Sequence, residues 1–203
     1  AGHVKGEFGE LLGRLATWRE AQQQAHQHAS EMQWQRAADA AERAIGLYPE
    51  YVDEGSAYLV KARAYEELGQ SEATTAALRE YHARGGHNPD ALTQLARELV
   101  AAGQRDAAID VFDDLLMVAP LRPDIHAQFG DLLLEAGNAA RAITEYAAYL
   151  AMNPHDQAAA HYRLAKAYHS LENLEKSREH LLYALEIAPH YREAQDLLLE
   201  IVR

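Results

Sequence analysis

The feature that most constrains this chain is a pattern of apolar and small residues that recurs along most of its 203 residues. The pattern is clearest over residues 89–122. Its positions there are Leu92, Leu95, Ala96, Leu99, Gly103, Ala108, Phe112, Leu115 and Pro120. The apolar positions on either side of Gly103 advance in steps of three and four residues, as they do on one face of an α-helix. The segment is therefore predicted to form two amphipathic helices joined by a short turn.

The glycine, the alanines and the proline of this segment can each be explained by the geometry of the helix pair. Gly103 is suited to a tight left-handed turn between the two helices. Ala96 and Ala108 stand where the paired helices should approach most closely, so a larger side chain would force the helices apart. Pro120 lacks a backbone N–H and restricts the preceding residue, so it ends the second helix.

The same spacing recurs on both sides of this segment, and Pro154 lies 34 residues after Pro120. Residues 123–157 carry it as His126, Phe129, Gly130, Leu133, Gly137, Ala142, Tyr146, Tyr149 and Pro154. Residues 158–191 carry it as His161, Leu164, Ala165, Tyr168, Glu172, Ser177, Leu181, Ala184 and Pro189. Upstream, residues 55–88 carry Tyr58, Lys61, Ala62, Tyr65, Gly69, Thr74, Leu78, Tyr81 and Gly86, and residues 18–54 match mainly through Ala37, Ala41, Ala44 and Pro49.

This pattern resembles the tetratricopeptide repeat, whose signature runs from a large residue through Leu-Gly, Tyr, Ala and Phe to Pro. The resemblance implies an all-α fold, a right-handed superhelical solenoid of antiparallel helix pairs. Its five units would cover residues 18–54, 55–88, 89–122, 123–157 and 158–191. Residues 1–17 would be a linker leading into a helix from about Glu7, and residues 192–203 would form a capping helix with a polar outer surface.

Two segments allow two interpretations each. Leu11, Leu12, Leu15 and Trp18 share one helical face. That face either packs on the next helix around Trp34 or forms a junction to an upstream domain. Gly85-Gly86 replaces the proline expected at the end of its unit. This pair is either an ordinary turn or a hinge between the first two units and the last three.

Composition excludes several classes of function. The net charge of −12 disfavours nucleic acid and anionic membrane surfaces as main partners, because both require a basic surface. The absence of cysteine removes disulfides and thiolate chemistry, but it does not assign a redox compartment. No apolar run approaches the roughly 18 residues needed to cross a bilayer.

No motif for catalysis or metal binding stands out. HExxH, G-x-S-x-G, Walker and dinucleotide-binding sequences are absent. His126 and His161 occupy the fourth position of their units, where they are predicted to pack in place of a large side chain. His26 and His28 would point to different faces of a helix, and His82 and His87 flank the Gly-Gly turn. No catalytic residue, metal site or cofactor is predicted.

The resemblance also implies a binding surface. In this family the first helix of each unit lines a concave groove that takes an extended peptide or a partner's helix. Carrying the inward positions over selects Leu59, Arg63, Arg97, Asp131, Tyr162, Lys166 and His169 as groove residues. At one of these inward-facing positions the five units carry His26, Arg63, Arg97, Asp131 and Lys166. This row of residues is mostly basic, although the chain as a whole is acidic.

Two interpretations of this row remain open. Asp131 could pair with Arg97 and Lys166, giving a ladder of internal ion pairs of little net energy. Alternatively, the row could bind an acidic peptide, with Tyr162 and Leu59 as apolar anchors. The carboxylate clamp of chaperone-binding members is not reproduced, because the nearest set is Thr93, Arg97, Gln128, Ala159 and Arg163, without the two lysines.

The expected function is a protein-interaction scaffold that binds a peptide or partner segment, without nucleic acid or membrane insertion. One alternative is a C-terminal helper module of a larger, possibly hydrolytic, enzyme, since the chain begins without methionine and its first helix has no cap. A second alternative is a structural module that assembles with copies of itself.

Overall fold

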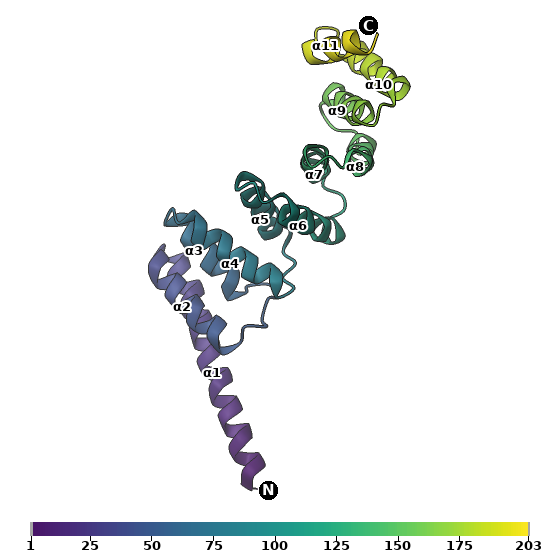
Figure 1. The fold of residues 1–203 in the computed structure, drawn as a ribbon. Helices are drawn as coiled ribbons and strands as arrows, with labels where there is room; N and C mark the ends of the chain where they lie inside the picture. Colours follow the sequence, from purple (N-terminus) through teal and green to yellow (C-terminus); the bar gives the residue numbers. More distant parts are fainter. Residues whose placement is uncertain (1, 203) are drawn as a thin grey trace. The chain divides into compact units, whose positions relative to one another are not determined.

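The protein is all-α. The computed structural model describes residues 2–202, and the side chains from residue 9 onward. The described residues form helices and no strand (Figure 1). The helices are α1 (Gly2–Ser30), α2 (Trp34–Leu47), α3 (Ala57–Glu67), α4 (Ser71–Ala83), α5 (Pro89–Ala101), α6 (Arg105–Val118), α7 (Pro123–Glu135), α8 (Ala139–Ala151), α9 (Gln157–Ser170), α10 (Leu174–Ile187) and α11 (Arg192–Ile201).

Within each of the two units of the chain, most helices pack on a neighbour in sequence. The chain divides into two compact units, and the division falls inside α5, between Leu99 and Val100. In the N-terminal unit, α2 packs on α1 and α3, and α3 packs on α4. In the C-terminal unit each helix from α6 to α11 packs on the next. The predicted all-α fold of adjacent helix pairs is confirmed.

Polar side chains start several of these helices. Asn138, Asp156 and Asn173 each accept a hydrogen bond from a backbone N–H in the first turn of α8, α9 and α10. Ser56 does the same for α3. Such caps satisfy N–H groups that have no partner within the helix, and each is typically worth about 1 kcal/mol.

The turn inside each helix pair uses one backbone conformation. Gly69, Gly103 and Gly137 have φ angles of 70°, 70° and 79°, as predicted for Gly103. At the matching position of the first and fifth repeats, Met32 and Glu172 each have φ 58°. Only glycine adopts this left-handed region without a steric cost. The chain therefore makes the same turn at all five places and accepts strain at two of them.

Small residues fill the closest approaches between helices, as expected. Ala96, Ala108, Ala142 and Ala165 are all completely buried. Interiors of this density leave no room for an added methylene without displacement of neighbours. The repeating alanines are therefore explained by packing and need no functional account.

The first helix differs from expectation at its start. It begins at Gly2, whereas the sequence suggested a linker and a start near Glu7. The glycines at positions 2, 6, 9 and 13 lower the helix propensity of this segment, but no proline interrupts residues 2–30 and the helix continues through them. Leu11 and Leu12 on this helix are half exposed.

The apolar face of α1 packs on the loop that follows α2. The Trp18 ring meets the rings of Tyr48 and Tyr51 edge to face, with centroid distances of 5.5 and 5.0 Å. The Arg14 guanidinium donates to the Leu47 carbonyl oxygen at 2.7 Å. Packing around Trp34 had been expected, but the rings that Trp18 meets lie in the loop after α2.

The Gly85-Gly86 pair forms a packed turn. Gly85 has φ 84°. Gly86 lies against the ring of buried Tyr81, and a Cβ on Gly86 would come within 2.4 Å of that ring. The Tyr81 hydroxyl accepts a hydrogen bond from the Asn88 N–H at 3.0 Å. Both glycines are therefore required by the local geometry, and the division between compact units lies further along the chain, within α5.

The C-terminal helix packs through one apolar face. Buried Ala194 joins a cluster with Ala165, Leu181 and Ala184, and Leu197, Leu198 and Ile201 pack against it, as predicted. The exposed face of α11 is mostly polar, as predicted, and carries Arg192, Glu193, Asp196 and Glu200. An open hollow of about 640 Å³ lies between α10 and α11, and it is bordered by apolar Leu174, Leu182, Ile201 and Val202 and by charged Glu175, Arg178 and Glu179. The hydrophobic face of α10 is wider than the single helix α11 covers.

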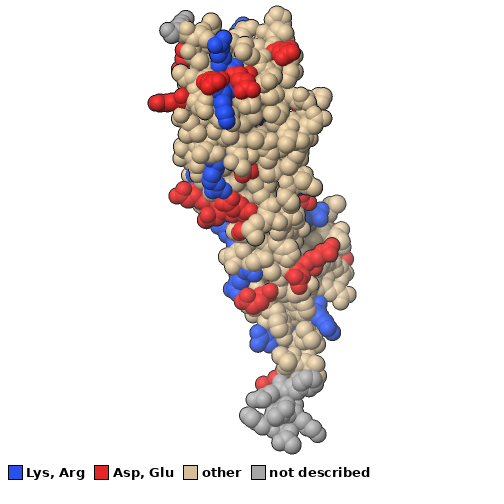
Figure 2. All heavy atoms as spheres, turned by 90° about the vertical axis from the view of Figure 1, so that its right-hand side faces the viewer, with Lys and Arg blue, Asp and Glu red and all other residues tan. Residues whose placement is uncertain are grey.

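Charged side chains are dispersed over the surface. On the face shown in Figure 2, Lys and Arg lie among Asp and Glu, and no continuous basic area is visible there. Within the described residues, no helix combines the length and hydrophobicity that a membrane span requires.

Candidate functional site

Three of the predicted groove residues meet in one hollow of the C-terminal unit. Asp131, Tyr162 and Lys166 line a depression of about 460 Å³, which we call the C-terminal hollow. Helices α7 and α9, the first helices of the fourth and fifth repeats, supply most of its lining. The remaining lining residues are Leu134, Glu135, Tyr146, Ala159, Arg163, Ser170 and Tyr191.

Asp131 is held by two hydrogen bonds to the same carboxylate oxygen. The Tyr146 hydroxyl donates to it at 2.8 Å, and the Arg163 Nε donates to it at 3.1 Å. Burial, and then the bond to Asp131, raise the pKa of Tyr146 well above its usual value, so this phenol stays protonated and acts as a donor. The ion pair neutralises Asp131 within the protein.

The buried tyrosine fits because the residue before Asp131 is glycine. A Cβ on Gly130 would lie 2.5 Å from a ring carbon of Tyr146. Tyr146 itself is almost completely buried. Gly130 therefore lets the ring pass close to α7, so that the hydroxyl reaches the Asp131 carboxylate at the edge of the hollow.

The pairing of Asp131 corrects the predicted charge ladder. Its partner on α9 is Arg163, whereas Lys166 had been expected. The Lys166 ammonium lies 5.8 Å from the centre of the Tyr162 ring, on the same helix. Arg163 is three residues earlier on α9, and its Nε reaches the Asp131 carboxylate. The ladder fails because which side chain reaches Asp131 depends on how α9 is rotated against α7.

Two cations of the hollow keep N–H donors that have no hydrogen-bond acceptor among the described residues, although the Arg163 guanidinium also lies 5.9 Å from the centre of the Tyr149 ring. Asp131 uses only the Nε of Arg163, and the guanidinium has four further N–H donors. Among the described residues, Lys166 has neither an ion pair nor a hydrogen-bond acceptor for its ammonium group. The two side chains are three residues apart on one helix, so they lie on neighbouring parts of the same face.

Two tyrosines form an aromatic wall of the hollow. The rings of Tyr162 and Tyr191 lie 5.1 Å apart. Tyr162 also packs against the cluster that holds α11, so it is partly structural, whereas a free anchor had been predicted. Burial, followed by the charges of Glu193 and Asp196, raises the pKa of Tyr162, so its hydroxyl remains a donor.

His169, another predicted groove residue, does not line this hollow. Its Nε2 lies 4.0 Å from a carboxylate oxygen of Glu200 on α11. The side chain therefore faces the last helix. The sequence could not show this, because the position of α11 relative to α9 is not part of the repeat pattern.

Two other predicted groove residues, Leu59 and Arg63, line a hollow in the N-terminal unit. This N-terminal hollow has a volume of about 510 Å³. It lies between α1 and α3, with the loop before α3 at its edge. The other lining residues are His26, Ala29, Ser30, Met32, Trp34, Gly55, Ser56, Val60 and Glu67.

The inward residues of α1 bind this loop. The Gln22 Nε2 donates to the Gly55 carbonyl oxygen at 2.7 Å, and His26 Nε2 lies 2.8 Å from the same oxygen. Gly55 has φ 79°, a left-handed conformation that favours glycine. The Arg63 guanidinium lies 5.6 Å from the centre of the Trp34 ring. The inward side chains of α1 thus stabilise the fold.

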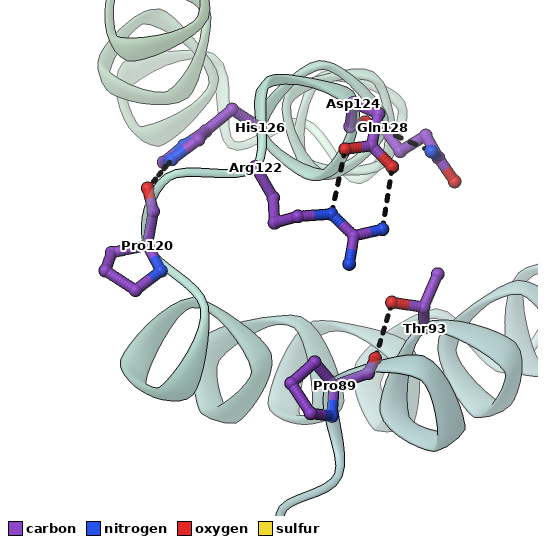
Figure 3. A network of polar contacts seen from close by, with 7 residues as sticks. All are labelled: Pro89, Thr93, Pro120, Arg122, Asp124, His126 and Gln128. Carbon is purple, nitrogen blue, oxygen red and sulfur yellow. Dashed lines mark hydrogen bonds and ion pairs between the residues drawn. The ribbon is translucent and has the colours of Figure 1, made fainter.

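Arg97 lines neither hollow. It is exposed on α5. On the same helix, the Thr93 hydroxyl donates to the Pro89 carbonyl oxygen at 2.7 Å (Figure 3). That bond occupies the threonine that the sequence comparison placed at a clamp position.

The two histidines predicted to pack do so through polar partners. His126 places Nδ1 2.7 Å from a Glu145 carboxylate oxygen. Its Nε2 lies 2.9 Å from the Pro120 carbonyl oxygen (Figure 3). His161 places its Nδ1 3.0 Å from the Nδ1 of His180. Both pairs are 19 residues apart in sequence. The same contact between first and second helix is therefore made in consecutive repeats.

A third contact in Figure 3 tightens the start of α7. The Arg122 Nε and Nη2 each donate to the Asp124 carboxylate at 3.2 Å. The Gln128 Nε2 donates to the Asp124 carbonyl oxygen at 3.0 Å. Both the Arg122 and the Gln128 side chains are therefore held at the first turn of α7 by Asp124.

Sequence reasoning missed Tyr191 and the role of Arg163 in the hollow, and it missed Glu145 and His180 as histidine partners. The last two had a usable signal, because each lies 19 residues after its histidine, a separation that joins the two helices of one repeat. Within the described part of the chain, no group of three His, Asp or Glu residues could hold a metal ion.

Comparison with known families decides the classification. The family model described as tetratricopeptide repeat matches residues 93–156 and again residues 127–192. The chain is a tetratricopeptide repeat protein. A search of curated proteins finds no significant match.

Solved structures with the same fold are tetratricopeptide repeat proteins. The crystal structure of YrrB, described as having an unusual peptide-binding site, has a TM-score of 0.64 and 23% identity over 85% of this chain and 87% of that chain. MamA from Desulfovibrio magneticus RS-1, from residue 41 to its end, has a TM-score of 0.60 and 26% identity over 71% and 81%. The first repeat domain of Spaghetti, bound to the HSP90 peptide SRMEEVD, has a TM-score of 0.51 and 22% identity over 56% and 90%.

Proposed function

We propose that this chain is a protein-interaction scaffold that binds an extended segment of a partner in the C-terminal hollow. One observation carries the proposal. Residues selected as groove-facing from the repeat alone, Asp131, Tyr162 and Lys166, border a single hollow together with unpaired donors. A hollow of about 460 Å³ with aromatic walls suits one or two side chains of a peptide.

The relatives support the class of function. YrrB is described as having a peptide-binding site, and the Spaghetti domain is bound to a peptide. These proteins share the fold with this chain at low identity, so they supply no residue assignments. The HSP90 peptide is not proposed as the ligand here, because the two lysines of the carboxylate clamp are absent from the matching positions.

Binding rather than catalysis is proposed, in keeping with a family whose members generally act as scaffolds. The donors and rings of the C-terminal hollow can hold a peptide by hydrogen bonds and apolar contact. Peptide recognition of this kind requires preformed pockets and a few oriented polar groups.

A steric block tests the proposal directly. Ala159 lines the hollow, whereas Ala140 is exposed on α8 outside it. Random dodecapeptides displayed on phage would be selected on the wild-type chain, on Ala159→Arg and on Ala140→Arg. We expect peptides selected on the wild type to bind Ala140→Arg equally and Ala159→Arg at least tenfold more weakly.

Two results would overturn the proposal. One is equal binding of the selected peptides to Ala159→Arg, which would place the binding face elsewhere. The other is the absence of any enriched peptide on the wild-type chain. Circular dichroism melts of both arginine variants show that the comparison is made between folded proteins.

A further inference from the structure

The C-terminal hollow has more free donors than free acceptors. We infer that its partner segment is acidic, with a carboxylate held between Arg163 and Lys166 and an apolar side chain against the Tyr162 and Tyr191 rings. This inference rests on the proposed function. It further assigns Asp131 and Tyr146 as positioning residues for Arg163.

The donor surplus follows from the contacts in the hollow. Four N–H donors of Arg163 and the ammonium of Lys166 have no acceptor among the described residues. The hydroxyls of Tyr162 and Tyr191 add two donors without a described acceptor. Burial raises the pKa of both phenols, so both keep their hydrogens at neutral pH. A ligand that satisfies these groups must bring acceptors.

The acidic groups of the hollow reduce this surplus only in part. Asp131 is neutralised by Arg163, and its bonded oxygen already accepts twice. Glu135 is exposed at the end of α7 and is the remaining carboxylate of the lining. Glu193 and Asp196 on α11 act on Tyr162 from outside the lining. These carboxylates disfavour a ligand with many negative charges, so we infer one or two acidic residues near Arg163 and Lys166.

A series of contacts that begins in the core fixes the orientation of the Arg163 side chain. Gly130 admits the buried Tyr146 ring, and the Tyr146 hydroxyl binds Asp131. Asp131 then takes the Nε of Arg163, which leaves the two terminal amino groups of the guanidinium for a ligand. A planar guanidinium with two parallel N–H groups available binds a carboxylate in a bidentate manner, which a lysine cannot do.

The test uses the same random dodecapeptide library on the full chain. Peptides selected on the wild type should be enriched about twofold or more in Asp and Glu relative to the input. Arg163→Lys keeps the charge but removes the fork, so the enrichment should fall to near the input value. Arg178→Gln, an exposed arginine on α10 outside this hollow, should leave the enrichment unchanged.

Tyr146→Phe examines the positioning role. It removes one hydroxyl and keeps the buried ring. We expect its peptides to lose the acidic enrichment while Leu and aromatic residues stay enriched, because only the orientation of Arg163 changes. A merely structural role for the hydroxyl would lower all binding together and leave the composition of the selected peptides as in the wild type, which would overturn the assignment.

The outcomes separate this inference from the proposed function. Peptides that fail on Ala159→Arg but show no acidic enrichment, or a basic one, would overturn the inference and leave the scaffold function standing. If no peptides are enriched on the wild type, both fall. Acidic peptides that bind Arg163→Lys as well as the wild type would overturn the role of Arg163.

Discussion

The two hollows use the same repeat positions for different purposes. In the N-terminal hollow, His26 and Gln22 both contact the Gly55 carbonyl oxygen, and Arg63 lies over Trp34. In the C-terminal hollow, Lys166 has no described ion-pair partner, and Arg163 has donors to spare. Gln22 and His26 therefore hold the fold together in one unit, whereas Lys166 and the terminal N–H groups of Arg163 remain available in the other.

The difference lies in the chain between repeats. Extra residues follow Pro49, and they form the loop that carries Gly55 to the inward face of α1. A shorter connection joins α8 to α9. An inward position therefore does not determine whether a side chain is free to bind a partner. The neighbouring loop decides which polar groups are already satisfied.

The largest expected effect comes from filling the space that Gly130 leaves for Tyr146. Gly130→Ala would bring a methyl group within 2.5 Å of the Tyr146 ring, so the ring must move and its bond to Asp131 is lost. Overpacking of this kind costs roughly 1–3 kcal/mol of unfolding free energy. Thermal melts should show destabilisation, and acidic peptides should bind less well.

Gly46→Ala is the matched control in the other unit. Gly46 lies in α2 with open space around it. The same substitution should stabilise there, by up to about 1 kcal/mol, because alanine favours the helix. If Gly130→Ala raised the melting temperature as Gly46→Ala does, the close packing of Tyr146 on α7 would be wrong.

Acid should destabilise the C-terminal unit through the His161–His180 pair. Burial lowers the pKa of both histidines below 6.5, and the charge of His161 lowers that of His180 further. The unfolded chain therefore takes up protons first as the pH falls through 6.5, and stability decreases until the folded pKa is reached. Two protonated rings 3.0 Å apart would also repel each other.

Melting temperatures between pH 7.5 and pH 5 measure this effect. Stacked Tyr168, with Tyr183, Lys176 and Glu179, completes the surroundings of His180. His180→Phe removes one titrating ring, so its melting temperature should fall less than that of the wild type. His155→Gln, at an exposed histidine, should follow the wild-type profile. Parallel profiles for wild type and His180→Phe would contradict the assignment.

A smaller effect is expected at the two strained turns. Glu172→Gly and Met32→Gly place glycine where φ is 58°, so each should stabilise its unit by about 1 kcal/mol or less. Gly137→Ala, at φ 79°, should destabilise by a similar amount. The experiment compares the units at equivalent positions, and opposite signs for Glu172→Gly and Met32→Gly would show that the turns are not equivalent.

Much of the fold could be predicted because repeat spacing encodes local geometry. Gly103 was expected in a left-handed turn, and Ala142 at a close approach, from their positions alone. Both depend on contacts within one helix pair. The hollow beside α11 was not predicted, because the width of the apolar face on α10 cannot be judged until α11 is placed on it.

The site was less predictable, because it depends on contacts between repeats. Asp131, Tyr162 and Lys166 were predicted to face one groove and all three line the C-terminal hollow, but the partner of Asp131 is Arg163. That choice depends on the rotation between α7 and α9, which the spacing does not specify. The position of His169 depends on α11, which lies outside the repeat pattern.

The central claim is that Gln22 and His26 are committed to the fold beside the N-terminal hollow, whereas Lys166 is available in the C-terminal hollow. Two double variants of the full chain test it, and both leave the net charge unchanged. Gln22→Ala with His26→Ala removes both side-chain contacts to Gly55. Lys166→Ala with Glu135→Ala removes two charged lining residues that have no described ion-pair or hydrogen-bond partner.

The measurement is the change in thermal stability of these two double variants relative to the wild type. Loss of two hydrogen bonds should cost the first variant about 1–3 kcal/mol. The second should stay within about 0.5 kcal/mol of the wild type, as is usual for exposed residues without such contacts. Equal destabilisation of both variants, or destabilisation of the second alone, would contradict the account.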